Sequence, residues 1–282
     1  MNVDYFKYHA LGNDYIVIDP NKTRLSLTKK NIQLICHRHF GLGSDGILYG
    51  PDFDGGGIKL RIFNPDGSEA EKSGNGIRIF SRYLFDQGYI RDSCTLDTLG
   101  GEVLVTILDG KGELIRVDMG TVTFSSESIP VAGLSREVVN EVLELDNGSF
   151  KITCLSIGNP HCVLLTDKVS EELAKTLGPI IENHPMFPNR INIQFLKILD
   201  RNNIRIEIWE RGAGYTLASG SSSCAAAIAA FKLGLVNNQV KVHMPGGVID
   251  IDINPDGHIH MTGSVSSISS GAFSDELWQR LE

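Results

Sequence analysis

Two serines stand at equivalent places in two copies of one local sequence. Ser73-Gly74-Asn75 and Ser219-Gly220-Ser221 are separated by a constant 146 positions, and each serine lies on a glycine turn before a helical segment. A helix N-terminus offers unpaired N–H groups and about half a positive charge, so two of them together form a strong carboxylate site. A proton-transferring group at each helix start, on either face of a carbon bonded to that carboxylate, is the arrangement that inverts the carbon. This pattern predicts racemisation or epimerisation.

Serine alone at these positions is an ordinary N-cap residue, and that structural role is common. The surrounding polar residues favour a site, because they fall at strand ends or in glycine-bounded turns, where side chains face ligands more often than the core. These residues are Asn13, Asn64, Asn159, Asn192, Glu210 and Arg211.

The same offset relates further pairs: Gly12-Asn13 with Gly158-Asn159, Phe63-Asn64 with Trp209-Glu210, Gly88 with Gly234, and Gly100-Gly101 with Gly246-Gly247. A period this long lies outside the roughly 20–50 residues of solenoid and propeller units, so it indicates two homologous domains. We expect the first domain to comprise residues 1–122 and 266–282 and the second residues 123–265. The cleft between them is the predicted active site.

Both halves show the same order of expected elements. Each expected element has one copy in each half. We expect strands at 15–19 and 162–166, 58–63 and 204–209, 102–108 and 248–253, and 114–119 and 258–261. We expect helices at 28–39 and 171–177, and at 76–86 and 224–233. We therefore predict an α+β fold of two pseudo-symmetric domains, each an antiparallel sheet or barrel around a central helix. Residues 121–150 form the expected connection, with a helix at 136–145.

Composition narrows the possible partners. The 282 residues carry a net charge of −8, which argues against nucleic acid or an anionic membrane and predicts a small-molecule partner. The charged segment 1–7 and the lack of any run of 18 apolar residues predict a cytoplasmic protein. Five scattered cysteines without C-x-x-C indicate neither disulfides nor a zinc site, and we predict no metal.

Six stretches together resemble the diaminopimelate epimerase family, whose members are cofactor-independent enzymes of lysine and cell-wall biosynthesis. The resemblance covers nearly the whole chain. The stretches are His9-Ala10-Leu11-Gly12-Asn13-Asp14, Asn64-Pro65-Asp66-Gly67-Ser68-Glu69, Ser73-Gly74-Asn75-Gly76, Gly158-Asn159-Pro160-His161, Glu210-Arg211-Gly212-Ala213-Gly214 and Met244-Pro245-Gly246-Gly247.

The resemblance implies epimerisation of LL-2,6-diaminopimelate to the meso form, without pyridoxal phosphate, by two bases at positions 73 and 219. It implies that similar enzymes are homodimers. It also implies a role for each matching residue. The distal carboxylate of the substrate would be held by Asn64, Asn159, Asn192 and Arg211, its distal ammonium by Glu210, and the site would be lined by Asn13 as well. The reacting carboxylate would be bound by Gly74, Asn75, Gly220 and Ser221, and the two bases would have His161 and Glu210 beside them.

The chain departs from the family at the two bases, because the family has cysteine where this chain has Ser73 and Ser219. A thiol ionises near pH ~8.5 and an aliphatic hydroxyl much less readily, so we expect impaired proton transfer. One interpretation is that the cysteines were replaced by serine to trap bound substrate. Natural divergence would also produce serine at both positions. Tyr215 also replaces the glutamate of many relatives, and Gly46 the glutamine of some.

Two other functions stay open at the level of sequence. One is a racemase of another amino acid, such as histidine or glutamate; the set Asn64, Asn192 and Arg211 argues against histidine because it calls for a second carboxylate. The other is a non-catalytic homologue that binds an amino acid without turnover.

Overall fold

The computed structural model describes residues 3–53, 57–146 and 148–281 of the chain. The first two residues of the charged N-terminal segment lie outside this range. The chain divides into two compact units, residues 1–117 with 263–282, and residues 118–262. Within the described part of the chain, no helix is both long and apolar enough to span a bilayer.

The first unit is a mixed sheet with two longer helices. Its strands are paired in the order β18-β1-β2-β3-β4-β6-β7-β8, with the short β5 beside β4. The elements are β1 (Tyr5–Ala10), β2 (Asn13–Ile18), α1 (Lys29–Cys36), β3 (Ile47–Asp52), β4 (Ile58–Phe63), β5 (Glu69–Ala70), α2 (Gly74–Asp86), β6 (Ser93–Thr98), β7 (Gly101–Ile107), β8 (Leu114–Thr121), which runs across the unit boundary, β18 (Ser266–Gly271) and α5 (Asp275–Trp278).

The second unit repeats this order as β9-β10-β11-β12-β13-β15-β16-β17, with β14 beside β13. The elements are β9 (Glu141–Leu145), β10 (Gly148–Ser156), β11 (Pro160–Leu165), α3 (Glu171–Glu182), β12 (Asn192–Asp200), β13 (Asn203–Glu210), β14 (Gly214–Thr216), α4 (Gly220–Lys232), β15 (Gln239–Met244), β16 (Gly247–Ile253) and β17 (His258–Ser264), the last also crossing the boundary.

Among the strand pairs whose register the structure describes, most are antiparallel and two in each unit are parallel. The parallel pairs are β2–β3 and β4–β6 in the first unit and β11–β12 and β13–β15 in the second. Each parallel pair is joined through a helix, because a parallel connection needs a crossover of a dozen or more residues. The crossovers place α1, α2, α3 and α4 against the sheets.

The duplication is visible in the element bounds. α2 and α4, β6 and β15, and β7 and β16 each begin and end 146 residues apart. The α+β fold predicted from the sequence is confirmed, and the repeated local pattern folds in the same way twice.

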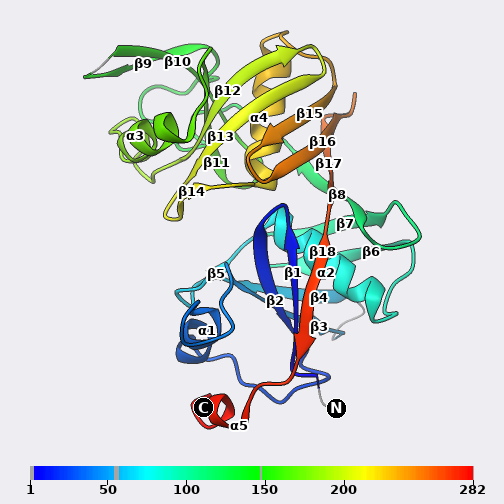
Figure 1. Cartoon of the computed structure of the whole chain (residues 1–282). Helices are drawn as coiled ribbons and strands as arrows, with labels where there is room; N and C mark the ends of the chain where they lie inside the picture. Colours follow the sequence, from blue (N-terminus) through cyan, green and yellow to red (C-terminus); the bar gives the residue numbers. More distant parts are fainter. Residues whose placement is uncertain (1–2, 54–56, 147, 282) are drawn as a thin grey trace. The chain divides into compact units, whose positions relative to one another are not determined.

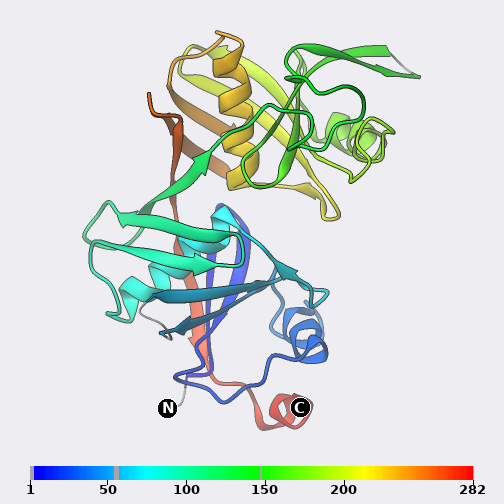
Figure 2. The ribbon, with the colours of Figure 1, turned by 180° about the vertical axis from the view of Figure 1, so that it is seen from behind.

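The central helices are buried because of their composition. In α2 the side chains of Ile77, Ile79 and Phe80 are fully buried. In α4 the run Cys224–Ala230 is almost entirely small residues and is also buried, so strands approach it from several sides. Figures 1 and 2 show α2 (cyan) and α4 (gold) each lying against the strands of its own unit.

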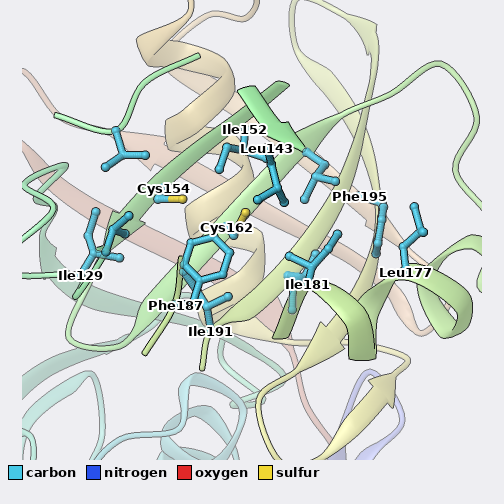
Figure 3. Close-up of a cluster of buried hydrophobic side chains, with 14 of the residues drawn as sticks. Ile129, Leu143, Ile152, Cys154, Cys162, Leu177, Ile181, Phe187, Ile191 and Phe195 are labelled. Atoms are coloured by element: carbon cyan, nitrogen blue, oxygen red, sulfur yellow. The ribbon is translucent and has the colours of Figure 1, made fainter. Parts of the chain in front are cut away.

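A separate hydrophobic cluster lies between α3 and strands β10 to β12 in the second unit. Leu177 and Ile181 of α3 pack toward Cys154, Cys162 and Phe195 of the sheet (Figure 3). This cluster supports the strand ends that carry the polar residues described below.

The helix predicted at 136–145 is wrong. Residues Glu141–Leu145 form strand β9, which pairs in a hairpin with β10 from Glu141↔Ile152 to Leu145↔Gly148. Only Leu143 of this strand is fully buried, and its neighbours alternate toward solvent as in a strand. Ladder hydrogen bonds and the packing of Leu143 override the helical spacing of the apolar residues.

Candidate active site

Ser73 lies directly before α2 as its N-cap. Its Oγ accepts a hydrogen bond of 3.1 Å from the N–H of Gly76, and its backbone is extended, with φ −139° and ψ 114°. The same Oγ lies 3.4 Å from the phenolic oxygen of Tyr15, which enters from β2. The first turn of a helix directs its N–H groups and the positive end of the helix dipole away from the helix, and this is the arrangement that binds an anion.

Next to Ser73, a chain of side-chain amides links α2 to the start of β2. Asn75 donates to Asn13 Oδ1 at 3.0 Å, and Asn13 donates to Asp45 at 2.9 Å. The buried guanidinium of Arg78 donates to Asn75 Oδ1 at 2.5 Å and to the carbonyl of Gly74 at 3.4 Å. A cation at one end and a carboxylate at the other therefore determine the orientation of both amides.

Asn64 lies in the turn between β4 and β5. Its backbone N–H donates to the carbonyl of Ser68 at 2.8 Å and its amide donates to Ser68 Oγ at 3.0 Å. Gly67, with φ +83°, lets the turn close. The turn therefore fixes Asn64 independently of the amide chain.

Ser219 occupies the same place before α4. Its Oγ accepts from the N–H of Ser222 at 3.4 Å and lies 3.5 Å from the hydroxyl of Ser221. Asn159, the counterpart of Asn13, donates to Ser221 at 3.4 Å. The second unit therefore repeats the N-cap and the neighbouring amide, with looser hydrogen bonds.

His161 is completely buried beside this group. Its Nε2 pairs with Asn159 Oδ1 at 2.9 Å, and because an amide oxygen only accepts, Nε2 carries the proton. Burial lowers the pKa of His161 to about 3; the neighbouring Gln194 side chain opposes this shift and the charge of Arg211 adds to it. The imidazole is therefore neutral near pH 7 and orients Asn159.

A third group surrounds the turn between β13 and β14. Asn192 donates to the carbonyl of Pro160 at 2.8 Å and accepts from the N–H of Arg211 at 3.0 Å. Asn192 lies opposite His161 on the neighbouring strand. Its amide therefore ties the start of β11 to the turn that carries Glu210 and Arg211.

Glu182, at the end of α3, anchors the same turn. Its buried carboxylate accepts from the N–H of Gly212 at 2.9 Å, from the indole of Trp209 at 2.7 Å and from Arg190 at 3.1 Å. Three donors on one carboxylate hold the turn rigidly, which leaves Glu210 half-buried and Arg211 exposed.

Tyr215, one of the departures from the family pattern, belongs to the scaffold of this turn. Its hydroxyl donates to the buried Glu207 at 2.7 Å, and the ammonium of Lys175 lies 5.2 Å from its ring centre. Burial, reinforced by the hydrogen bond to Glu207, raises the pKa of Tyr215. The phenol is therefore a hydrogen-bond donor at neutral pH.

The structure links the predicted residues into separate groups. Hydrogen bonds join Asn13 with Asn75 and Asn159 with Ser221 and His161, close to Ser73 and Ser219 respectively. Asn192 and Arg211 form a further group, and Asn64 is held in its own turn. Sequence reasoning missed Tyr15, Asp45, Arg78, Glu182 and Gln194. Tyr15 could have been found as the equivalent of His161 in the repeat, because the two lie 146 residues apart. No feature of the sequence indicates the other four residues.

Fold and site together define a duplicated α+β protein in which each unit presents a hydroxyl and a helix N-terminus, as suits a small carboxylate ligand. The family model for diaminopimelate epimerase matches residues 5–125 and 153–268. The chain belongs to the diaminopimelate epimerase family.

Individual relatives agree with this assignment. Diaminopimelate epimerase 2 of Nostoc sp. (strain PCC 7120) is 55% identical over 97% of this chain and 96% of its own. Diaminopimelate epimerase of Moorella thermoacetica is 38% identical over 95% and 98%. Among solved structures, a hydroxyproline epimerase of Agrobacterium vitis shares the fold with a TM-score of 0.69 at 12% identity, covering 98% of this chain and 95% of that one.

Proposed function

We propose that this chain binds 2,6-diaminopimelate and that its site is built to interconvert the LL and meso forms without pyridoxal phosphate. The observation that carries the proposal is the duplicated N-cap hydroxyl: Ser73 and Ser219 begin α2 and α4 at the same position of the repeat. Membership of the family, with 55% identity to a diaminopimelate epimerase, supplies the substrate.

The reacting carboxylate would be bound by backbone N–H groups of the two first helical turns. The hydroxyls of Ser73 and Ser219 accept from the N–H groups of Gly76 and Ser222. The N–H groups proposed for the carboxylate come earlier in each first turn, at Gly74 and Asn75 and at Gly220 and Ser221. Positive helix ends stabilise the negative charge that develops as the α-proton leaves.

Positions 73 and 219 would act on opposite faces of one α-carbon. One group, in its anionic form, takes the α-proton and leaves a carbanion; the other, in its protonated form, gives its own proton to the opposite face. The pair ends with its protonation states exchanged, and no redox partner is involved. The neutral His161 and the carboxylate of Glu210 would lie beside these groups in the substrate complex.

The distal end of the substrate would be recognised by the polar turns. Asn64, Asn159, Asn192 and Arg211 would hold the distal carboxylate, and Glu210 the distal ammonium. The exposed guanidinium of Arg211, on a turn fixed by Glu182, suits a bidentate contact with a carboxylate. Asn13 would line the site through its hydrogen bond to Asn75.

Serine at both positions would make the chain as written a poor catalyst. An aliphatic hydroxyl is far less acidic than a thiol, and each unit of pKa is worth ~1.4 kcal/mol in the proton-transfer equilibrium. Serine is close to cysteine in shape, so ligand binding would persist.

The test is α-proton exchange in deuterated water. Incubate the chain, and a Ser73→Cys/Ser219→Cys variant, with LL-diaminopimelate and follow the α-hydrogen signal by NMR. We expect rapid exchange with the double variant and negligible exchange with the chain as written, while calorimetry shows that both bind the ligand.

The single variants Ser73→Cys and Ser219→Cys are the matched controls, because each restores one thiol and leaves the other position unable to complete the inversion. A double-cysteine variant that binds diaminopimelate without exchanging its α-proton would contradict the proposal. Tighter binding of histidine or glutamate than of diaminopimelate would move the assignment to another amino acid racemase.

A second candidate is a non-catalytic homologue that binds an amino acid. The two serines favour it, because they keep the N-caps while removing the thiols. Retained binding with no exchange even in the double-cysteine variant is its signature.

We also infer a homodimer from the family resemblance and a cytoplasmic location from the composition of the chain. Sedimentation equilibrium of the purified chain tests the assembly: a mass of twice 30.9 kDa supports the dimer, and a mass of 30.9 kDa excludes it.

A further inference from the structure

We propose that Tyr15 is a positioning residue of the first unit, whose phenolic hydroxyl hydrogen-bonds the proton-transferring group at position 73 and stabilises its anion. The consequence is that positions 73 and 219 differ in acidity, with position 73 the stronger acid. This inference rests on the function proposed above, since it concerns the same site.

The contact itself is direct. Tyr15 is 7% exposed, and its phenolic oxygen lies 3.4 Å from Ser73 Oγ, which already accepts the N–H of Gly76 at 3.1 Å. The Gly76 N–H and the Tyr15 phenol therefore converge on one atom, and either hydroxyl of the Tyr15–Ser73 pair can be the donor. The separation from Tyr15 is longer than the ~2.7–2.8 Å usual between two hydroxyls. The longer carbon–sulfur bond and larger radius of a cysteine at position 73 would close this gap.

Gly46 makes room for the tyrosine ring. A Cβ at position 46 would lie 2.6 Å from Tyr15 Cε1 and 2.4 Å from the carbonyl oxygen of Phe63. Gly46 directly precedes β3, which pairs in parallel with β2, and the N–H of Ile16 donates to the Gly46 carbonyl at 3.1 Å. A larger residue at position 46 would displace the ring that delivers the hydroxyl.

The repeat shows what differs in the second unit. His161 is the equivalent of Tyr15 in the second copy of the repeat, 146 residues later. Its Nε2, however, hydrogen-bonds to Asn159 and not to Ser219. Ser219 Oγ instead has the N–H of Ser222 at 3.4 Å and the hydroxyl of Ser221 at 3.5 Å. The first unit thus has a phenol aimed at its N-cap atom, whereas the second uses the equivalent side chain to orient an amide.

The hydroxyl suits both protonation states of its partner. A protonated group at position 73 donates to the phenolic oxygen; once ionised, it accepts the phenolic O–H together with the N–H of Gly76. Tyr15 keeps its own proton throughout, so the α-proton is transferred only between the substrate carbon and position 73. Hydrogen bonds to ionised groups are about twice as strong as those between neutral groups, so the contact favours the anion.

Other charges act on position 73 as well. α2 contributes its positive end and the buried Arg78, and Asp45 reaches the site through Asn13. Asp14 of β2 is paired with Lys7 of β1 and with Arg38. A substitution that removes only the phenolic oxygen leaves all of these groups in place, so it isolates the effect of Tyr15.

The experiment measures the thiol pKa without any substrate. Ser73→Cys and Ser219→Cys variants are made with and without Tyr15→Phe, and the rate of iodoacetamide alkylation at each introduced thiol is followed against pH by peptide mass mapping, which separates the five native cysteines. We expect Tyr15→Phe to lower the neutral-pH alkylation rate at position 73 by about tenfold or more, through a higher thiol pKa, and to leave position 219 unchanged.

Two further variants complete the design. Tyr89→Phe removes a phenol of the same unit that binds Asp19 at 3.0 Å, and it should shift neither thiol. Replacing Tyr15 by 3-fluorotyrosine, a stronger donor of nearly the same shape, should lower the thiol pKa at position 73. Unchanged pH profiles, or equal shifts at positions 73 and 219, would overturn the inference. Because no substrate is used, this outcome is independent of whether diaminopimelate is epimerised.

Discussion

The imidazole of His161 is neutral because it is buried, and this has a consequence for stability. Its folded-state pKa of about 3 lies below the ~6.5 of an exposed histidine, so between these values the unfolded chain binds more protons than the folded one. Stability contributed by the neutral imidazole is therefore present above pH ~6.5 and is lost as the pH falls.

We expect the free energy of unfolding to decrease as the pH is lowered from 7 to 5, with His161 contributing at most about 1.4 kcal/mol per pH unit. His161→Gln keeps a donor for Asn159 without titrating, so it should flatten this dependence. Urea unfolding of both proteins at pH 7, 6 and 5 measures the two slopes; equal slopes would show that His161 is not the group responsible.

At the scale of elements, the turn between β13 and β14 depends on a carboxylate outside it. Glu182→Ala leaves the exposed N–H of Gly212 and the partly buried indole of Trp209 without their acceptor, and the loss at the indole should cost about 1–3 kcal/mol. Because this turn carries Arg211, we expect weaker binding of diaminopimelate, by about tenfold, as well as lower stability.

Calorimetric titration and urea unfolding measure these two effects. Glu171→Ala on the same helix is the matched control: its pair with Lys175 is solvent-exposed, and its loss should change stability by less than about 0.5 kcal/mol. Unchanged ligand affinity in Glu182→Ala would show that the turn holds its shape without this anchor.

The two N-caps can be tested in the same way. Ser73→Ala and Ser219→Ala should each destabilise the chain by about 0.5–2 kcal/mol, because the N–H groups of Gly76 and Ser222 lose their partner. Ser170→Ala, which removes the N-cap of α3, is the control for capping away from the site. If the affinity for diaminopimelate falls in Ser73→Ala and Ser219→Ala but not in Ser170→Ala, the two serines contribute to binding as well as to capping. Equal affinity in all three variants would count against the serine turns as the binding site.

At the scale of the whole molecule, the first unit requires both ends of the chain. β18 pairs with β1 from Tyr5↔Gly271 to His9↔Ser266, and Phe273 stacks on Tyr5 at 5.7 Å and meets Trp278 edge-on at 5.5 Å. Residues 118–262, by contrast, form a continuous stretch with a hydrophobic cluster of their own.

Deleting residues 263–282 should therefore unfold the first unit selectively. Hydrogen exchange followed by mass spectrometry should show lost protection in β1 and β2, with protection retained in β11 to β13. Phe273→Ala, a milder change, should cost about 3–5 kcal/mol. Uniform loss of protection across both units would show that they unfold as one.

The sequence by itself determined the repeat and the features that follow from local pattern. The serine turns and the C-terminal ends of α2 and α4 depend on residues close together in the chain, including the glycines that follow the helices, Gly88 with φ +75° and Gly234 with φ +70°. The two helices begin at Gly74 and Gly220, earlier than the predicted starts at 76 and 224. The family follows from the same motifs, since their order and spacing are properties of the sequence alone.

Tertiary structure decided everything that depends on which distant residues meet. Residues 141–145 form a strand because β10 lies beside them, despite a spacing that also suits a helix. Tyr15 reaches Ser73, and Glu182 reaches Gly212, across 58 and 30 positions of chain. Sequence periodicity reports the environment of a residue but not its partner, because register and side-chain packing choose the partner only when the sheet has formed.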